Sequence, residues 1–542
     1  MNTLIAKSLL ATPAPIESSY FPTRLLDVGS STISTELRLI VTVEHPMLNG
    51  ELDPAKKRYA ALSYCWGTGD KAKKQLRTTR HTIQKHTSEI EFKKLPQTVA
   101  DAVQVCRHIG IRYLWVDALC IIQDSQEDWA EESFEMSKIY ANSFITLCIL
   151  QGSYCSSGFL ENPHSPQTLQ INFRSILDSS VSGRLYLRML HPPKFNFDYY
   201  RKESPKAIGG NRDKPGDADI RVAPWSRRGR TFQESCLSPR KLLFGTRMFH
   251  ISCGNLHESA DEDDFDDTAL LSQGEMGLSD VMNKWYDLVR NYGLRHLTYE
   301  RDRFPGLSAL ARTISDQFPD QQYLAGLWKS DLHRGFLWIP HAVGGSLLNH
   351  MRSHEDGYIA PTWSWARHPF DLKWLKGTFS SEFEVRDTNI VTDDLNPYGR
   401  LLSGHLTLHA EVCELPLREE KGKVIAKSNG DVNWFRADFQ YRLLSERNER
   451  IAALHIDWRT FRAEVHEEDP IDQLWMILTS SGKPPEDDLR HRDPVELMLG
   501  VLVLPTENED EFVKVGLWYS EALGPGGGKL WDDIPRWSVT LA

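Results

Sequence analysis

Residues 95–150 have the sequence LPQTVADAVQVCRHIGIRYLWVDALCIIQDSQEDWAEESFEMSKIYANSFITLCIL, and this stretch decides the fold. Apolar residues recur at helical spacing over 99–109, which predicts an amphipathic helix. The next residues, 111–117, are almost continuously apolar, as is typical of a parallel strand covered on both faces. A second amphipathic helix is predicted over 126–142, and residues 144–150 supply another buried strand.

An earlier strand completes this pattern, because Tyr59 to Gly67 (YAALSYCWG) is short, apolar and stopped by glycine. Strand, helix, strand, helix, strand is the signature of an open, mostly parallel α/β sheet with flanking helices. Ligand sites in such sheets lie beyond the carboxyl ends of the strands. Ser63 to Gly67 and Asp117 to Asp124 both fall there, so we expect the functional site at these two ends.

Local features around these elements give three further expectations. Thr98 and Asp101 have the spacing of a capping box at the start of the first helix. Trp115 and Trp129 are expected to fill the core between sheet and helices. The lysine-rich residues 70–94 are interpreted as a solvated insertion.

The 542 residues exceed what one hydrophobic core normally organises, so we expect two domains. We interpret residues 1–45 as an N-terminal extension and 46–258 as the α/β domain, with an irregular insertion at about 152–222. An acidic boundary and a helical segment follow at 259–320. Residues 321–542 contain short alternating apolar segments separated by Gly, Pro and Asn, which predict a β-rich C-terminal domain.

Composition excludes several classes of partner. The formal net charge is -11 without a basic tract, so we expect no nucleic-acid partner. The longest apolar runs, such as 144–150, are far shorter than the ~20 residues that cross a bilayer. Neither they nor the N-terminus predict a membrane span or a secretory signal, so we expect a cytoplasmic protein.

No metal site is predicted from the sequence. The eight cysteines contain no Cys-x-x-Cys pair, which disfavours zinc and thioredoxin-type sites. Residues 261–267 (DEDDFDD) are acidic but lack the ligand spacing and the glycine of a calcium-binding EF-hand loop. We interpret them as a solvated boundary.

Three blocks of sequence together resemble the segments that define the fungal heterokaryon incompatibility (HET) domain. They are AALSYCWG at 60–67, the region 95–150 centred on LWVDALCIIQD at 114–124, and RGRTFQESCLSPR at 228–240. Three later segments, LTYERDR at 297–303, YLAGLW at 323–328 and APTWSW at 360–365, are similar to segments common in long HET proteins. The chain departs from the family, which usually has tryptophan at the positions of Arg230 and His250.

The resemblance implies a role in fungal non-self recognition, in which contact between incompatible cells triggers growth arrest or programmed cell death. Its partners would be proteins bound for recognition or self-association. HET domains are also considered similar to the TIR fold, a flavodoxin-like sheet, and some TIR domains hydrolyse NAD. The resemblance therefore makes NAD a candidate substrate rather than a resident cofactor, and it places Glu234 at the position of the catalytic glutamate.

Candidate site residues follow from this chemistry. Cleavage of an N-glycosidic bond passes through an oxocarbenium-like state that a carboxylate stabilises, so Glu234 and Asp117 are candidate catalytic groups. Arg228 could hold a phosphate, and Tyr64 and Trp66 could stack on a flat base. The remaining candidates for ligand binding are Ser63, Gly67, Gln123, Asp124 and Gln233.

Each candidate also has a purely structural interpretation. Glu234 and Gln233 could bridge packed elements, with Arg228 as an ion-pair partner, and Asp117 could cap the turn that follows its strand. At the level of the whole chain, two alternatives to incompatibility signalling remain open. One is an NAD-cleaving hydrolase, and the other is a HET-like protein recruited to a different pathway, such as specialised metabolite biosynthesis.

Overall fold

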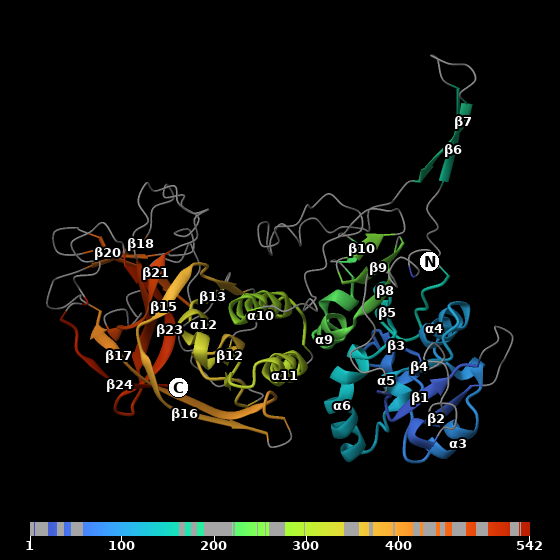
Figure 1. Ribbon diagram of the computed structural model, residues 1–542, viewed down its shortest axis with the longest axis horizontal. Helices are drawn as coiled ribbons and strands as arrows, with labels where there is room; N and C mark the ends of the chain where they lie inside the picture. The colour runs from blue at the N-terminus through green and yellow to red at the C-terminus, as the bar shows by residue number, and fades with distance from the viewer. Residues whose placement is uncertain are drawn as a thin grey trace. The chain divides into compact units, whose positions relative to one another are not determined.

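A computed structural model shows two compact units, residues 1–274 and 275–542, each with its own sheet (Figure 1). The structure describes residues 5, 20–29, 37–44, 58–161, 168–174, 182–188, 219–220, 223–246, 248–254, 256–259, 277–297, 299–340, 357–367, 372–393, 396–415, 423–426, 441–444, 450–457, 473–483, 497–520, 531 and 533–542. The acidic run at 261–267 lies outside the described residues.

The first unit is built on an eight-stranded mixed sheet with the order β10-β9-β8-β5-β3-β4-β1-β2. Its strands are β1 (Arg24–Asp27), β2 (Arg38–Val41), β3 (Tyr59–Ser63), β4 (Tyr113–Trp115), β5 (Ile145–Ile149), β8 (Arg240–Phe244), β9 (Phe249–Cys253) and β10 (Leu256–Ser259). The four central strands, β8, β5, β3 and β4, are parallel, and both edges continue antiparallel. The α/β prediction is confirmed in this form, and the segment expected as an N-terminal extension supplies β1 and β2.

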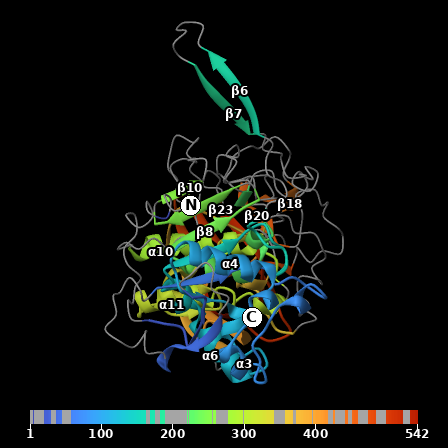
Figure 2. The same cartoon turned by 90° about the vertical axis from the view of Figure 1, so that its right-hand side faces the viewer.

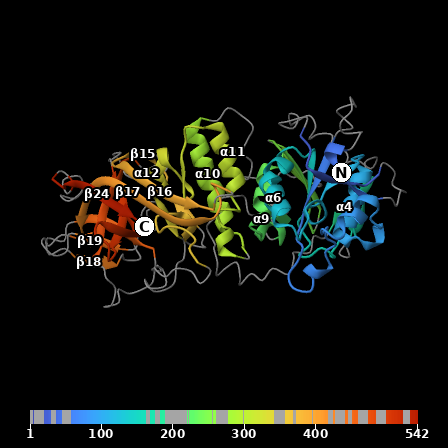
Figure 3. The same ribbon diagram turned by 90° about the horizontal axis from the view of Figure 1, so that it is seen from below.

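Helices cover both faces of this sheet. Helix α4 (Gln97–His108) packs on one face with the side chains of Ala60 and Leu62, whereas α6 (Gln126–Ala141) packs on the other with Tyr59 and Ala61 (Figures 2 and 3). Successive side chains of a strand point to opposite faces. The near-continuous apolar sequence of β3 is explained because both of its faces are buried.

Helix α9 (Arg230–Leu237) contacts α6 and so lies on the same side of the sheet (Figure 3). By the alternation of side chains along β3, Ser63 shares the face of Tyr59 and Ala61. Ser63 therefore points towards the side on which α6 and α9 lie.

Thr98 and Asp101 do not form the expected capping box. Helix α4 begins at Gln97 with no side-chain cap, so both residues already lie inside the helix. Their buried side chains accept hydrogen bonds from a later segment instead. Thr98 Oγ1 accepts the Gly158 amide at 3.3 Å, and Asp101 Oδ2 accepts the amides of Phe159 at 2.6 Å and Leu160 at 3.1 Å.

Two other expectations are wrong. Trp129 is 45% exposed, because the inward face of its helix, α6, is formed by Ile139 and Tyr140. Trp115, in contrast, is fully buried.

Residues 70–94 are not a solvated insertion. They contain α3 (Ile83–Ser88). Thr78 is buried and forms a β-bridge with Ile122, within the predicted site segment 117–124. The lysines of this stretch are exposed.

Part of the expected irregular insertion is regular. Strands β6 (Thr168–Arg174) and β7 (Ser182–Arg188) form an antiparallel hairpin (Figure 2). The other residues between 162 and 218, and 221–222, lie outside the described part of the chain.

The second unit is β-rich, as predicted. Its ten-stranded sheet contains β15 (Thr378–Ser381), β16 (Glu384–Thr392), β17 (Leu401–Glu414), β18 (Lys423–Ala426), β19 (Tyr441–Leu444), β20 (Arg450–Ile456), β21 (Trp475–Lys483), β22 (Leu497–Pro505), β23 (Glu511–Ser520) and β24 (Arg536–Leu541). The pairings β17-β21-β22-β23-β24-β17 form a closed circuit. A closed circuit leaves none of these five strands as a free edge.

Shorter elements precede this sheet in the chain. They are α10 (Leu278–Gly293), α11 (Ser308–Gln317), α12 (Leu332–Gly335) and the strand pairs β11 (Tyr323–Leu324) with β12 (Leu327–Trp328) and β13 (Trp338–Pro340) with β14 (Leu372–Trp374). None of the helices in the described residues is long and apolar enough to cross a membrane.

The hydrogen bonds of Asp101 give a test of the fold. Asp101→Ala should lower the free energy of unfolding by roughly 1–3 kcal/mol, because the buried amide of Phe159 and the partly buried amide of Leu160 lose their acceptor. Gln104→Ala, on the exposed side of the same helix, is the matched control. Denaturant titration monitored by tryptophan fluorescence measures both, and equal midpoints for the two variants would contradict the role of Asp101.

Candidate functional site

The predicted site residues lie where the order of the parallel strands in the sheet reverses. Strand β3 is flanked by β4 on one side and by β5 on the other. The central strands therefore follow the order second, first, third, fourth, which is the order of flavodoxin-like sheets. Ligands bind such sheets at the carboxyl ends next to the strand where the order reverses. Ser63 is the last residue of β3.

Ser63 joins the sheet to Glu234 of α9. The Ser63 hydroxyl donates a hydrogen bond to Glu234 Oε2 and accepts one from Trp225 Nε1 at 2.6 Å. All three side chains are buried. The indole N–H therefore orients the serine hydroxyl, and the hydroxyl in turn contacts the carboxyl group.

Burial raises the pKa of Glu234 to about 8, and the negative charge of Asp117 contributes to the rise. The Ser63 hydrogen bond, the positive charge of Arg228 and a hydrogen bond from Tyr140 act in the opposite direction. Desolvation outweighs these contacts, since a buried carboxylate loses more hydration than they return. Glu234 thus carries a proton at neutral pH.

Asp117 is the second carboxyl group of the site. It follows β4 and begins the short helix α5 (Asp117–Cys120), where its Oδ1 accepts the Ala118 amide at 2.7 Å and Trp66 Nε1 at 3.1 Å. Burial raises the pKa of Asp117 to about 6, although these two donors and the charges of Arg228 and Arg230 oppose the rise. Asp117 is therefore mostly ionised at neutral pH.

Electrostatic coupling connects the two carboxyl groups into one cluster. The charge of Asp117 raises the pKa of Glu234, and Arg228 lowers the pKa of both groups. The same arginine hydrogen-bonds Cys65, whose pKa burial raises. The structure thus brings Ser63, Trp66, Asp117 and Glu234 together, and we call these four residues with Arg228 the carboxyl cluster.

Of the other predicted residues, Gln123 contacts the carboxyl cluster, and Asp124 lies in an exposed turn. Gln123 Nε2 donates to the main-chain oxygen of Asp117 at 3.0 Å, and Asp124 accepts the Arg80 amide at 2.7 Å.

Gly67 has φ +96°, and a Cβ atom there would lie 2.7 Å from the Cβ atom of Tyr154. A side chain would not be tolerated at this position. Gln233 is half-buried on α9.

Tyr64 is not positioned to stack on a ligand. Its ring is buried in the core with α4, and its hydroxyl donates to Gln75 Oε1 at 2.9 Å. Alternation along the strand places it on the face opposite Ser63.

Two site residues were not identified from the sequence, Trp225 and Tyr140. Tyr140 Oη contacts the main-chain oxygen of Leu62 at 3.4 Å and also hydrogen-bonds Glu234. Both are aromatic residues whose O–H or N–H group needs a hydrogen-bond partner when the ring is buried. This need for a partner is the feature of the sequence that could have indicated them.

The carboxyl cluster lies within a segment of the chain that matches a known protein family. A model of the heterokaryon incompatibility protein (HET) family matches residues 59–234. The chain carries a HET domain. The match begins at the first residue of β3 and ends at Glu234, so it contains the whole carboxyl cluster. No curated protein and no solved structure matches the chain.

The structure places the two residues, Arg230 and His250, at which a departure from the family pattern was expected. His250 is fully buried in β9, with Nδ1 2.8 Å from Ser259 Oγ and Nε2 3.3 Å from Asp219 Oδ2. Arg230 is exposed at the start of α9, and its charge lowers the pKa of Asp117. His250 thus belongs to the buried interior, and the charge of Arg230 contributes to the electrostatics of the cluster.

No group of three or more His, Cys, Asp or Glu side chains that could hold a metal ion occurs among the described residues. The carboxyl cluster itself contains two carboxyl groups, and one of them is protonated at neutral pH. Its chemistry is therefore that of a proton-binding and cation-stabilising site.

The raised pKa of Glu234 predicts the pH dependence of stability. Because the folded state binds this proton more tightly than the unfolded chain, its contribution is complete below about pH 4.5 and is lost as the pH rises to about 8. Within this window the group lowers the free energy of unfolding by up to about 1.4 kcal/mol per pH unit.

Glu234→Gln should remove this dependence and make the protein more stable than the wild type at pH 8 and above. Denaturant titrations at pH 6 and pH 9 test the prediction, with the exposed Glu131→Gln of α6 as the control. A Glu234→Gln variant that loses as much stability as the wild type between these pH values would show that Glu234 is not the group.

Proposed function

We propose that this protein acts in fungal non-self recognition and that its HET domain is the effector that arrests growth or triggers cell death. The observation that supports the proposal is the carboxyl cluster, which lies at the carboxyl ends of parallel strands inside the matched domain. Buried carboxyl groups with raised pKa values are costly, and they concentrate at functional sites. A domain that only bridges partners has no need of them.

The chemistry that fits the cluster is hydrolysis of the N-glycosidic bond of NAD. In this step the bond between C1′ of the ribose and the nicotinamide nitrogen breaks, and nicotinamide leaves with the bonding electron pair. Water forms the new bond to C1′ and releases one proton, so that ADP-ribose, nicotinamide and a proton are the products. Positive charge develops on the ribose, and a carboxylate stabilises it.

The two carboxyl groups would divide the work. Asp117 is already largely ionised at neutral pH, whereas Glu234 is protonated in the free domain. The nicotinamide ring of NAD carries a positive charge, and a cation beside Glu234 favours its ionised form. Ser63, held by Trp225, would then hydrogen-bond the Glu234 carboxylate and fix its orientation.

Arg228 and Trp66 would bind the rest of the substrate. Arg228 is half-buried, and its charge acts on both carboxyl groups, so a phosphate at this position would lie near the reacting bond. The Trp66 indole is half-buried, and the hydrogen bond from its Nε1 to Asp117 holds it in place. One face of its ring is approached by the Arg77 guanidinium at 5.7 Å.

The cellular role predicts growth arrest. Induced expression of the full chain in a fungal host should stop colony growth, and Glu234→Gln should restore it while Glu131→Gln should not. Colony area and viability staining after induction measure the effect. Normal colonies with the wild-type chain at confirmed expression would count against an effector role and favour the alternative of a HET-like protein recruited to another pathway.

The catalytic role predicts turnover of NAD by purified protein. Glu234→Gln should lower kcat/KM by about 100-fold or more, which is typical for loss of an electrostatic or proton-transfer group. Nicotinamide release followed by chromatography measures it, with Glu131→Gln as the control. Equal turnover by Glu234→Gln would remove Glu234 from the mechanism.

The pH profile distinguishes the ionised from the protonated form of Glu234. Since kcat/KM reports the free enzyme, it should rise with pH and level off above about pH 8, where Glu234 ionises. A decrease of kcat/KM as the pH rises through 8 would contradict the proposed role, because it would mean that the protonated form of Glu234 is active.

A further inference from the structure

The three later segments that resemble long HET proteins meet around one cavity in the second unit. The segment 297–303 contributes Leu297, Glu300 and Arg303 to its lining, and 360–365 contributes Trp365. The segment 323–328 supports the wall, because the main-chain oxygen of Gly326 accepts the Trp365 indole at 2.9 Å. These distant parts of the chain therefore build a common feature.

Gly326 is required for this arrangement. Its φ of +91° lies in the left-handed region, and a Cβ atom would come within 2.4 Å of Trp365 Nε1. Its main-chain oxygen also accepts the Trp285 indole of α10 at 3.0 Å. Any side chain at 326 would displace the wall of the cavity.

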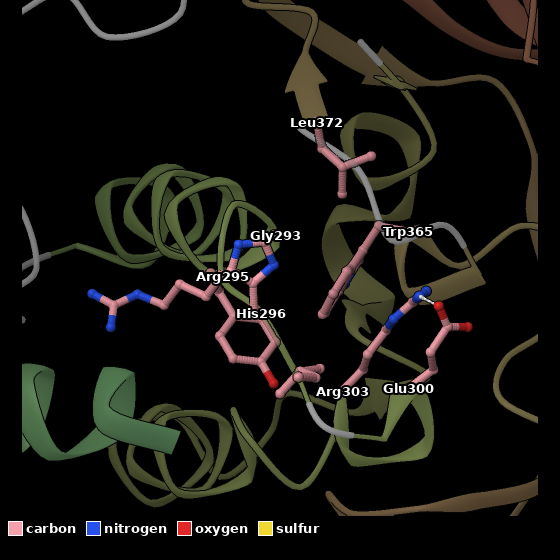
Figure 4. Close-up of a pocket in the computed structure, with 9 residues that line it drawn as sticks. Gly293, Arg295, His296, Glu300, Arg303, Trp365 and Leu372 are labelled. Atoms are coloured by element: carbon pink, nitrogen blue, oxygen red, sulfur yellow. Dashed lines mark ion pairs between the residues drawn. The ribbon is translucent and has the colours of Figure 1, made fainter. Parts of the chain in front are cut away.

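The cavity has a volume of about 190 Å³ and is lined by aromatic, apolar and charged groups (Figure 4). An apolar cavity of about 150 Å³ takes up one benzene ring. The space therefore fits a ligand with a single ring. Figure 4 shows Arg303 beside Glu300 and below Trp365, whereas the Arg295 side chain extends away from them.

Arg303 is a buried cation that lacks full compensation. Its side chain is 5% exposed, and one terminal nitrogen donates to the main-chain oxygen of Ala366. The other, Nη2, lies 3.3 Å from Glu300 Oε1 but makes no hydrogen bond within the described residues. Burial lowers the pKa of Arg303 to about 10 although the Glu300 carboxylate opposes the shift. A buried charge of this kind favours a closer anion.

Glu300 already shows which anion approaches this guanidinium. Its side chain is 39% exposed, so it can move into solvent, whereas Arg303 cannot. The planar fork of arginine matches a carboxylate in geometry, and such a pair is stronger than a single contact. Glu300 Oε1, at 3.3 Å from Arg303 Nη2, occupies the position that a ligand carboxylate would take.

We propose that this cavity binds a small aromatic carboxylate, with its carboxylate on Arg303 in exchange for Glu300 and its ring in the space beside Trp365. The second unit is then a receptor for a small organic anion. This inference goes beyond the proposed function of the HET domain and does not depend on NAD cleavage, because all of its residues belong to residues 275–542.

Calorimetric titration of the full-length protein with benzoate tests the proposal. Benzoate should bind at one site, and benzamide, its neutral analogue, should bind at least about tenfold more weakly. Glu300→Gln should tighten benzoate binding by about threefold or more because the competing carboxylate is removed. Glu384→Gln, an exposed acid of β16 in the same unit, should leave the affinity unchanged.

Arg303→Lys should weaken benzoate binding by about tenfold or more, and the exposed Glu300 variant keeps the proposal testable if the lysine variant does not fold. Equal affinity for benzoate and benzamide, or weaker binding of benzoate by Glu300→Gln, would overturn it. Tighter binding of phenyl phosphate than of benzoate would also overturn it, because the site would then select phosphate.

Discussion

The hydrogen bond from Ser63 to Glu234 joins the sheet of the HET domain to its buried acid. It joins the end of a central strand to a helix that follows about 170 residues later, and it lies in a region where an unpaired carboxyl group would be costly. Tyr140 provides a second donor to the carboxyl group, and Trp225 donates to Ser63. The domain tolerates this buried acid because two side chains from separate segments hydrogen-bond it.

Much of the α/β domain could be predicted from the sequence, because its central strands are buried on both faces and its helices are amphipathic. The period of the apolar residues in 95–150 was enough to place α4, β4, α6 and β5. Details that depend on the exact start of a helix were not predictable in this way. Asp101 was expected to cap α4, but the helix begins earlier and Asp101 binds residues 159 and 160 instead.

The site was predictable only in part for a similar reason. Ser63, Trp66 and Asp117 follow from the rule that ligands bind at the carboxyl ends of strands. Tyr64 was included because it is adjacent to them, although side-chain alternation turns it towards the opposite face. Trp225 and the cavity around Arg303 depend on contacts between distant segments, for which local periodicity carries no information. The family resemblance identified the three segments at the cavity, but it did not predict that they lie next to one another in the fold.

Carboxyl titration by infrared difference spectroscopy measures directly whether Glu234 is a buried, protonated acid coupled to Asp117. We expect one carboxylic acid band that disappears with a midpoint near pH 8, is missing in Glu234→Gln and titrates at lower pH in Asp117→Asn. A Glu234 carboxyl group that ionises near pH 4.5, or that does not respond to loss of the Asp117 charge, would contradict it.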